Sequence, residues 1–155
     1  MLEANNEMKR RLVLPWTKEK VEGKRVLDLF YANGAFSVEA ALAGVREVVG
    51  VEFSPERIEC ARFLAGTLEG KVDCSLNFMV GDVYGLSGLF SEPCGVVMAL
   101  GRLYHVAPYV LTQIGGLTKE HLIVRTATFR PRGPRETTHP APKALDRWVT
   151  TAGSR

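Results

Sequence analysis

The sequence predicts a single α/β domain organised around a parallel β-sheet with helices on both faces. The 155 residues suffice for one domain, and 46% hydrophobic with 24% charged residues is an ordinary globular composition. Between residues 24 and 128, short apolar runs alternate with helical stretches, as is typical of strands buried on both faces of a parallel sheet. Acidic residues stand where the first three runs end. These observations indicate a doubly wound sheet with polar groups gathered at one edge.

The organising segment covers residues 24–55, with the sequence KRVLDLFYANGAFSVEAALAGVREVVGVEFSP. Residues 25–30 are a short apolar run and predict a strand. Asn33 and Gly34 then supply turn chemistry, because both tolerate a left-handed backbone. Residues 35–43 are rich in Ala, Glu and Leu and predict a helix.

A second predicted strand, residues 48–51, is closed by Glu52. Two parallel strands joined by a helix form a right-handed βαβ unit, whose ligand crevice lies beyond the carboxyl ends of the strands. Asp28 and Glu52 both fall at that edge, which predicts a nucleotide-type cofactor site. A dinucleotide site would require G-x-G-x-x-G and a Walker loop would require Gly-Lys-Ser/Thr, and the turn contains neither.

The same segment resembles motif I of the class I S-adenosylmethionine-dependent methyltransferases, in the form D-L-F-x-x-x-G. The resemblance covers residues 24–129 and implies a Rossmann-like sheet of about five parallel strands in the order 3-2-1-4-5. It also implies S-adenosylmethionine as cofactor and S-adenosylhomocysteine as product. Glu52 would accept both ribose hydroxyls, which a carboxylate can do in bidentate fashion. Phe53 would stack on the adenine, and Asp28 with the turn backbone would face the methionine part.

A third acid, Asp82, follows the predicted strand of residues 75–80. The resemblance implies that this acid holds the adenine amino group, and a carboxylate is a suitable acceptor for an N–H donor. The alternative is that Asp82 caps a short helix over residues 83–90, a common use of Asp. The three acids are separated by about one strand-loop-helix repeat each, which favours the ligand role.

The fourth predicted strand, residues 95–100, opens on the sequence GRLYH. This looks like the G-x-L-Y-H segment of a methyltransferase subset that includes the carboxymethyl-transferring enzymes of the tRNA wobble uridine. In that subset the strand end lines the reactive part of the cofactor, and the tyrosine, here Tyr104, lies close to it. His105 is the general-base candidate, because His titrates near neutral pH and a hydroxyl acceptor would require a base. The alternative for His105 is a structural hydrogen bond at a helix start.

The full set of predicted site residues combines these motifs. Phe30 and Ala32 stand where glycines are common in the family. The predicted catalytic residues are His105 and Tyr104. The predicted cofactor-binding residues are Asp28, Phe30, Ala32, Asn33, Gly34, Phe36, Glu52, Phe53, Asp82, Val83, Leu100 and Gly101.

Several other functions are disfavoured by what the sequence contains. No Asp/Asn-Pro-Pro-Tyr/Phe follows the fourth strand, which disfavours the amino-methylating nucleic-acid enzymes. The pair Pro93-Cys94 precedes that strand, at the wrong edge of the sheet for a cytosine-C5 nucleophile, so we expect Cys94 to be a small buried hydrophobe. Three cysteines without metal-ligand spacing suit a reducing cytosol, so we expect no metal and a cytoplasmic location. No signal-peptide core is evident, and the net charge of +3 does not by itself indicate nucleic acid.

The ends of the chain carry three further expectations. We expect a leading helix over residues 1–14, a Pro- and Arg-rich loop over residues 129–142 and a terminal helix over residues 143–155. The family fold continues into an antiparallel β-hairpin beside strand five, which this sequence lacks. An exposed edge at strand five is an invitation to pair with another chain, so we expect a homodimer through that edge.

Two functions follow from these observations. The first is an S-adenosylmethionine-dependent methyltransferase acting on a small molecule or a nucleoside-type acceptor, with no membrane partner and nucleic acid not specifically indicated. The second is a non-catalytic or truncated domain that serves as a binding partner. The three acids and the GRLYH segment support the first function, and the expected lack of the C-terminal strands together with the altered glycine pattern supports the second. We favour the methyltransferase.

Overall fold

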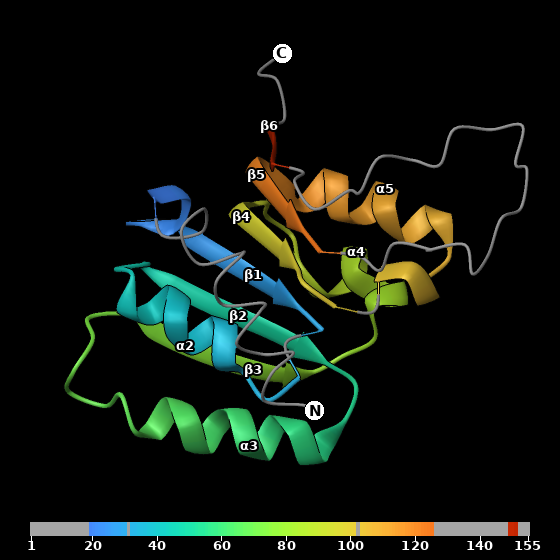
Figure 1. Cartoon of the computed structure of the whole chain (residues 1–155). Helices are drawn as coiled ribbons and strands as arrows, with labels where there is room; N and C mark the ends of the chain where they lie inside the picture. Colours follow the sequence, from blue (N-terminus) through green and yellow to red (C-terminus); the bar gives the residue numbers. More distant parts are fainter. Residues whose placement is uncertain (1–18, 31, 102, 126–148, 152–155) are drawn as a thin grey trace, which may run out of the picture.

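The computed structural model describes residues 19–30, 32–101, 103–125 and 149–151, which form a six-stranded sheet with helices on both faces (Figure 1). The strands are β1 (Arg25–Leu29), β2 (Glu47–Glu52), β3 (Ser75–Val80), β4 (Cys94–Ala99), β5 (Thr118–Val124) and β6 (Val149–Thr151). The helices are α2 (Ala35–Leu42), α3 (Pro55–Gly66), α4 (Leu86–Leu89) and α5 (Pro108–Leu117), with 3-10 turns η1 (Val83–Gly85) and η2 (Leu103–His105).

The sheet has the strand order β3-β2-β1-β4-β5-β6, and its first five strands are parallel. β1 lies between β2 and β4, with Asp28 opposite Gly50 on one side and Met98 on the other. The prediction of five parallel strands in the order 3-2-1-4-5 is therefore confirmed. The strand order reverses beside β1, since β2 and β3 follow on one side of it and β4 and β5 on the other. The loops after β1 and β4 therefore lie together, at the position where open α/β sheets bind ligands.

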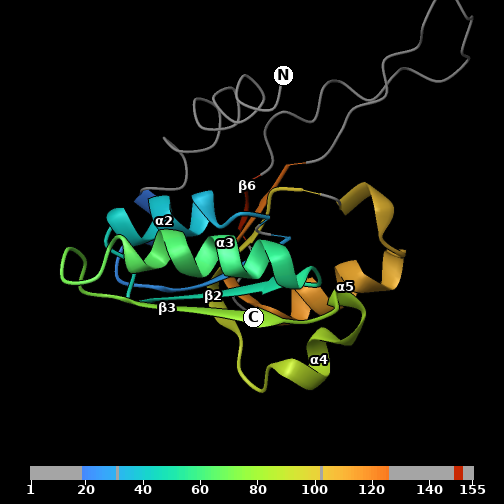
Figure 2. The same cartoon turned by 90° about the horizontal axis from the view of Figure 1, so that it is seen from below.

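The core is divided by the sheet into two layers (Figure 2). Successive side chains of a strand point to opposite faces. Accordingly, Leu27 and Leu29 of β1 pack in one cluster with Leu86 of α4 and Ile114 of α5. Val26 packs in the other cluster, on the face covered by α2 and α3. Cys94 is fully buried in the first cluster, as expected for a small hydrophobe.

β6 corrects two expectations about the end of the chain. Residues 149–151 pair antiparallel with β5, so the helix predicted over residues 143–155 is wrong at these positions. The three residues are Val-Thr-Thr, and β-branched side chains favour a strand. His121, Leu122 and Ile123 of β5 have partners in β6, so the edge expected to be exposed is covered there. The homodimer was predicted because that edge was expected to be exposed, and its pairing with β6 removes this reason.

The remaining differences concern element boundaries. The helix predicted over residues 83–90 is divided into η1 and α4, because Asp82 caps a tight first turn. The leading helix over residues 1–14 and the loop over residues 129–142 lie outside the described residues. Within the part of the chain that the structure describes, no helix has the length and apolar character needed to cross a bilayer.

Candidate functional site

A pocket of about 280 Å³ opens at the carboxyl edge of the sheet. Its walls come from the segments that end or follow four neighbouring strands, β1, β2, β3 and β4. The lining residues are Phe30, Val51, Glu52, Phe53, Gly81, Asp82, Val83, Tyr84, His105 and Val106. The pocket thus combines two carboxylates with aromatic and aliphatic side chains, which is the usual composition of a small-molecule site.

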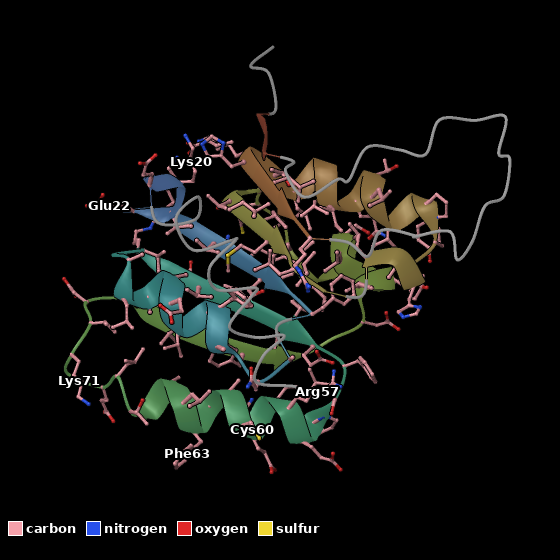
Figure 3. All side chains as sticks on the ribbon, in the orientation of Figure 1. Lys20, Glu22, Arg57, Cys60, Phe63 and Lys71 are labelled. Carbon is pink, nitrogen blue, oxygen red and sulfur yellow. The ribbon has the colours of Figure 1, made fainter. Side chains whose placement is uncertain are left out.

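Glu52, the last residue of β2, connects the two loops that flank the pocket. Its Oε2 accepts a hydrogen bond from the backbone N–H of Ala32 at 3.3 Å. Its Oε1 accepts from the backbone N–H groups of Phe53 at 3.2 Å and Ser54 at 3.4 Å. Arg57 lies in the first turn of α3 (Figure 3), and its Nη1 is 3.6 Å from Oε1 of Glu52. These contacts hold a carboxylate that is only 2% exposed in a fixed orientation at the pocket wall.

Asp28 lies deeper than the sequence suggested. It is 1% exposed within β1, and its Oδ2 accepts a hydrogen bond of 2.6 Å from the hydroxyl of Ser37 in α2. Burial raises the pKa of Asp28 to about 7, the Ser37 bond opposes this rise, and the nearby charge of Glu52 adds to it. Asp28 does not line the pocket, and its hydrogen bond with Ser37 ties β1 to the helix that follows.

The turn after β1 departs from ordinary backbone geometry. Phe30 and Ala32 have φ of 60° and 54°, in the left-handed region that glycine adopts without steric penalty. These are the two positions at which the sequence replaces common glycines. Gly34 has φ of 79° and begins α2. Asn33 accepts a hydrogen bond on Oδ1 from the backbone N–H of Ala35 at 3.3 Å, which closes the turn.

Asp82 has the capping role that the sequence left open. Its Oδ1 accepts a hydrogen bond of 2.9 Å from the backbone N–H of Tyr84, at the start of η1. The same side chain is exposed and lines the pocket. A carboxylate offers about four acceptor sites, so one capping bond is compatible with ligand binding.

Tyr84 is held in place from α5. Gln113 Nε2 donates to the backbone carbonyl of Tyr84 at 3.2 Å, and Gln113 Oε1 accepts from the backbone N–H of Ser87 at 3.0 Å. The rings of Tyr84 and Tyr109 are tilted by 48° with centroids 5.8 Å apart, a favourable aromatic arrangement. One wall of the pocket is thus built on the helix that packs beside it.

The segment after β4 contributes His105 to the pocket, whereas the predicted residues Leu100 and Gly101 do not line it. His105 ends η2, is exposed and lines the pocket with Val106. Leu100 is 6% exposed and belongs to the core cluster on the α2 face. Gly101 lies near the backbone of Phe30, since a Cβ built on it would be 3.9 Å from the Phe30 carbonyl oxygen. The side chain of Tyr104 lies outside what the structure describes.

The structure therefore brings together six of the fourteen predicted site residues in one pocket. The predicted residues that line it are Phe30, Glu52, Phe53, Asp82, Val83 and His105. The predicted residues that are described and do not line it are Asp28, Ala32, Asn33, Gly34, Phe36, Leu100 and Gly101. Of these, Phe36 is half-buried and packs against the core cluster on the α2 face.

Four lining residues were missed in the sequence, namely Val51, Gly81, Tyr84 and Val106. Gly81 could have been predicted from the sequence, because it directly precedes the predicted site residue Asp82. A Cβ built on Gly81 would approach Val51 Cγ1 to 2.9 Å, so the chain needs glycine to leave β3 here. Tyr84 was assigned to a helix, and only its neighbours in space place it at the pocket.

Within the described ranges, no cluster of three or more His, Cys, Asp or Glu side chains could hold a metal ion. No protein-family profile matches the sequence. In sequence, the chain is 43% identical over 53 residues to the 23S rRNA (uracil(747)-C(5))-methyltransferase of Proteus mirabilis, a match covering 34% of this chain and 14% of that protein. It is 44% identical over 46 residues to ribosomal RNA large subunit methyltransferase I of Shigella dysenteriae serotype 1, covering 30% and 12%. The matches thus span only a small part of each curated relative.

Solved structures share the fold over most of the chain. Magnesium protoporphyrin IX methyltransferase of Synechocystis PCC 6803, solved with bound S-adenosylmethionine, matches with a TM-score of 0.61 at 20% identity, over 74% of this chain and 56% of that one. The bifunctional kinase-methyltransferase WbdD matches with a TM-score of 0.60 at 22% identity, over 77% and 29%. The chain resembles class I S-adenosylmethionine-dependent methyltransferases, and its fold is theirs.

Proposed function

We propose that this chain is an S-adenosylmethionine-dependent methyltransferase domain that binds its cofactor at the carboxyl edge of the sheet. One observation carries the proposal, the meeting of Glu52, Asp82 and two aromatic side chains, Phe53 and Tyr84, in one pocket beside the turn after β1. The similarity in sequence to two rRNA methyltransferases supports it, as does the fold shared with a methyltransferase that was solved with this cofactor bound.

The residues present fit the nucleoside half of such a cofactor. Glu52 offers carboxylate oxygens for the two ribose hydroxyls, and its backbone hydrogen bonds fix it before the ligand arrives. Phe53 is 55% exposed, and an adenine would stack on its ring. Asp82 lines the same pocket and would accept the N–H of an exocyclic amine.

The cofactor would supply a methyl group already activated by its sulfonium. The protein's work is then to orient the two reactants and to exclude water, rather than to activate the leaving group. On transfer the acceptor would gain the methyl group and the sulfur would keep the electron pair of the broken carbon–sulfur bond, while Glu52 and Phe53 would hold the nucleoside half in place. An acceptor that carries a proton must lose it to water or to a base.

For the acceptor, we propose a nucleoside-type substrate over a small molecule. The support is the similarity to two relatives whose names describe rRNA as their substrate. The second candidate function, a non-catalytic binding domain, is favoured by the side chains of Phe30 and Ala32 in the left-handed turn, since both add bulk where glycines are common. Methyl transfer from radiolabelled cofactor to RNA tests the acceptor, and binding of the cofactor tests the site itself.

The decisive experiment is calorimetric titration of the protein with S-adenosylhomocysteine. We expect micromolar binding by the wild type and at least tenfold weaker binding by Glu52→Ala, because the variant loses charge-assisted hydrogen bonds to the ribose. Glu56→Ala is the matched control, since Glu56 is an exposed acid four residues further on, outside the pocket. Absence of binding by the folded wild type, or equal binding by Glu52→Ala, would contradict the proposal.

A further inference from the structure

His105 occupies a position that the general-base interpretation does not explain. It lines the same pocket as Phe53, Asp82, Val83 and Tyr84. Those residues come from the segments after β2 and β3, whereas His105 comes from the segment after β4. The fold therefore places the imidazole of His105 in the same pocket as the carboxylate of Asp82 and the rings of Phe53 and Tyr84.

The size of the pocket limits what it can hold. About 280 Å³ is at the lower end of the roughly 300–1,000 Å³ typical of small-molecule sites. A cofactor that joins a nucleoside to an amino acid would place one end there and the other end outside. The lining favours the nucleoside end, because Glu52 suits a diol and Phe53 and Tyr84 suit a flat aromatic base.

The residues expected around the methionine part lie elsewhere. Asn33, Gly34 and Gly101 do not line this pocket. Gly101 approaches the carbonyl of Phe30, which is the one described residue of the turn after β1 that lines the pocket, so this turn and the segment after β4 meet at Phe30. The methionine part of the cofactor would then be held by groups outside this pocket.

The position of Tyr84 is fixed by neighbouring residues before any ligand binds. Gln113 makes hydrogen bonds of 3.2 Å and 3.0 Å to the chain at Tyr84 and Ser87, which holds η1 and α4 against α5. Tyr109 packs on the Tyr84 ring. A ring held by its neighbours loses little freedom when a ligand stacks on it, so it contributes efficiently to binding.

We propose that His105 and Tyr84 contact the nucleobase of the cofactor, so that His105 is a cofactor-binding residue and not the base that deprotonates the acceptor. This inference rests on the proposed function. It assigns His105 to the nucleoside end by its pocket neighbours, and it adds Tyr84, which no sequence motif indicated.

The test is calorimetric titration of S-adenosylhomocysteine and, separately, of adenosine, with wild type, His105→Ala and Tyr84→Ala. We expect each variant to weaken both ligands about tenfold, the scale of a lost base–aromatic contact, and by a similar factor for the two ligands because they share the nucleoside. Thr112→Ala, an exposed substitution on α5 outside the pocket, is the control and should bind as wild type does. Circular dichroism establishes that each variant is folded.

The outcomes separate this inference from the proposed function. If the wild type binds S-adenosylhomocysteine and both His105→Ala and Tyr84→Ala bind it within twofold of wild type, the inference is wrong and the proposed function stands. If the wild type binds neither ligand, both are wrong. Should His105→Ala weaken S-adenosylhomocysteine but leave adenosine unchanged, His105 acts at the methionine end and the assignment is overturned.

Discussion

Asp28 combines a titratable carboxyl group with a position inside the sheet. It is 1% exposed, and the Ser37 hydroxyl is its hydrogen-bond donor. Burial raises its pKa to about 7, because removing a carboxyl group from water disfavours the charged form. Such a group is ionised in the unfolded chain at pH values where it is still protonated in the folded protein.

This shift predicts a specific pH dependence of stability. Below the ordinary pKa of 3.8, Asp28 is protonated in both the folded and the unfolded state, so it does not change how the free energy of unfolding varies with pH. Between pH 3.8 and about 7 the folded state binds the extra proton, so stability falls as pH rises, by up to about 1.4 kcal/mol per pH unit. Asp28→Asn removes this titration. Urea unfolding of both proteins from pH 4 to 8 should show the wild type losing stability relative to the variant, and parallel profiles would contradict the assignment.

At the scale of elements, the contact between α2 and α3 depends on Gly34. A Cβ built on Gly34 would lie 2.8 Å from Ala61 Cβ and 3.2 Å from Ala61 Cα. Gly34 also has φ of 79°, so it answers two requirements at once, a left-handed backbone and a close approach of two helices. The motif glycine thus serves the fold directly, whatever it contributes to ligand binding.

Gly34→Ala should therefore destabilise the protein by about 2–4 kcal/mol, the sum of left-handed strain and overpacking against α3. Gly70→Ala is the matched control, because Gly70 has a similar φ of 71° and no atom within 4 Å of its built Cβ. We expect about 1 kcal/mol for the control. Chemical denaturation measures both. Equal losses in the two variants would show that crowding against Ala61 contributes nothing.

At the scale of the whole molecule, ligand binding and folding are linked. The pocket is lined by the segments after four strands, so it exists only when the sheet is assembled. A ligand that binds the folded state alone raises the free energy of unfolding by about 2.7 kcal/mol at a concentration of 100 Kd.

S-adenosylhomocysteine at that concentration should raise the thermal midpoint by about 5–10 °C. Differential scanning fluorimetry measures the shift. Glu52→Ala at the same ligand concentration should show about half of this shift or less, because a tenfold weaker affinity reduces the stabilisation to about 1.4 kcal/mol. An identical shift in the two proteins would mean that the ligand binds away from Glu52.

The resemblance to a known family implied the strand order, whereas the sequence by itself determined the parallel sheet and the placing of Glu52 and Asp82 at one edge. These follow from local signals, since a buried strand is a contiguous apolar run and the residue after it must lie at the carboxyl edge. The resemblance to methyltransferases rested on the same contiguous motifs. The cap formed by Asp82 was also foreseen as an alternative, because capping involves residues only two positions apart.

Only the tertiary structure decided which distant residues meet. The pairing of β6 with β5 joins residues far apart in the chain, and a three-residue strand has no periodicity strong enough to reveal it. The bond from Ser37 to Asp28 and the support of Tyr84 by Gln113 likewise depend on how helices pack on the sheet. His105 reaches the wall that carries Asp82 for the same reason: contacts between elements are set by packing, which no local pattern encodes.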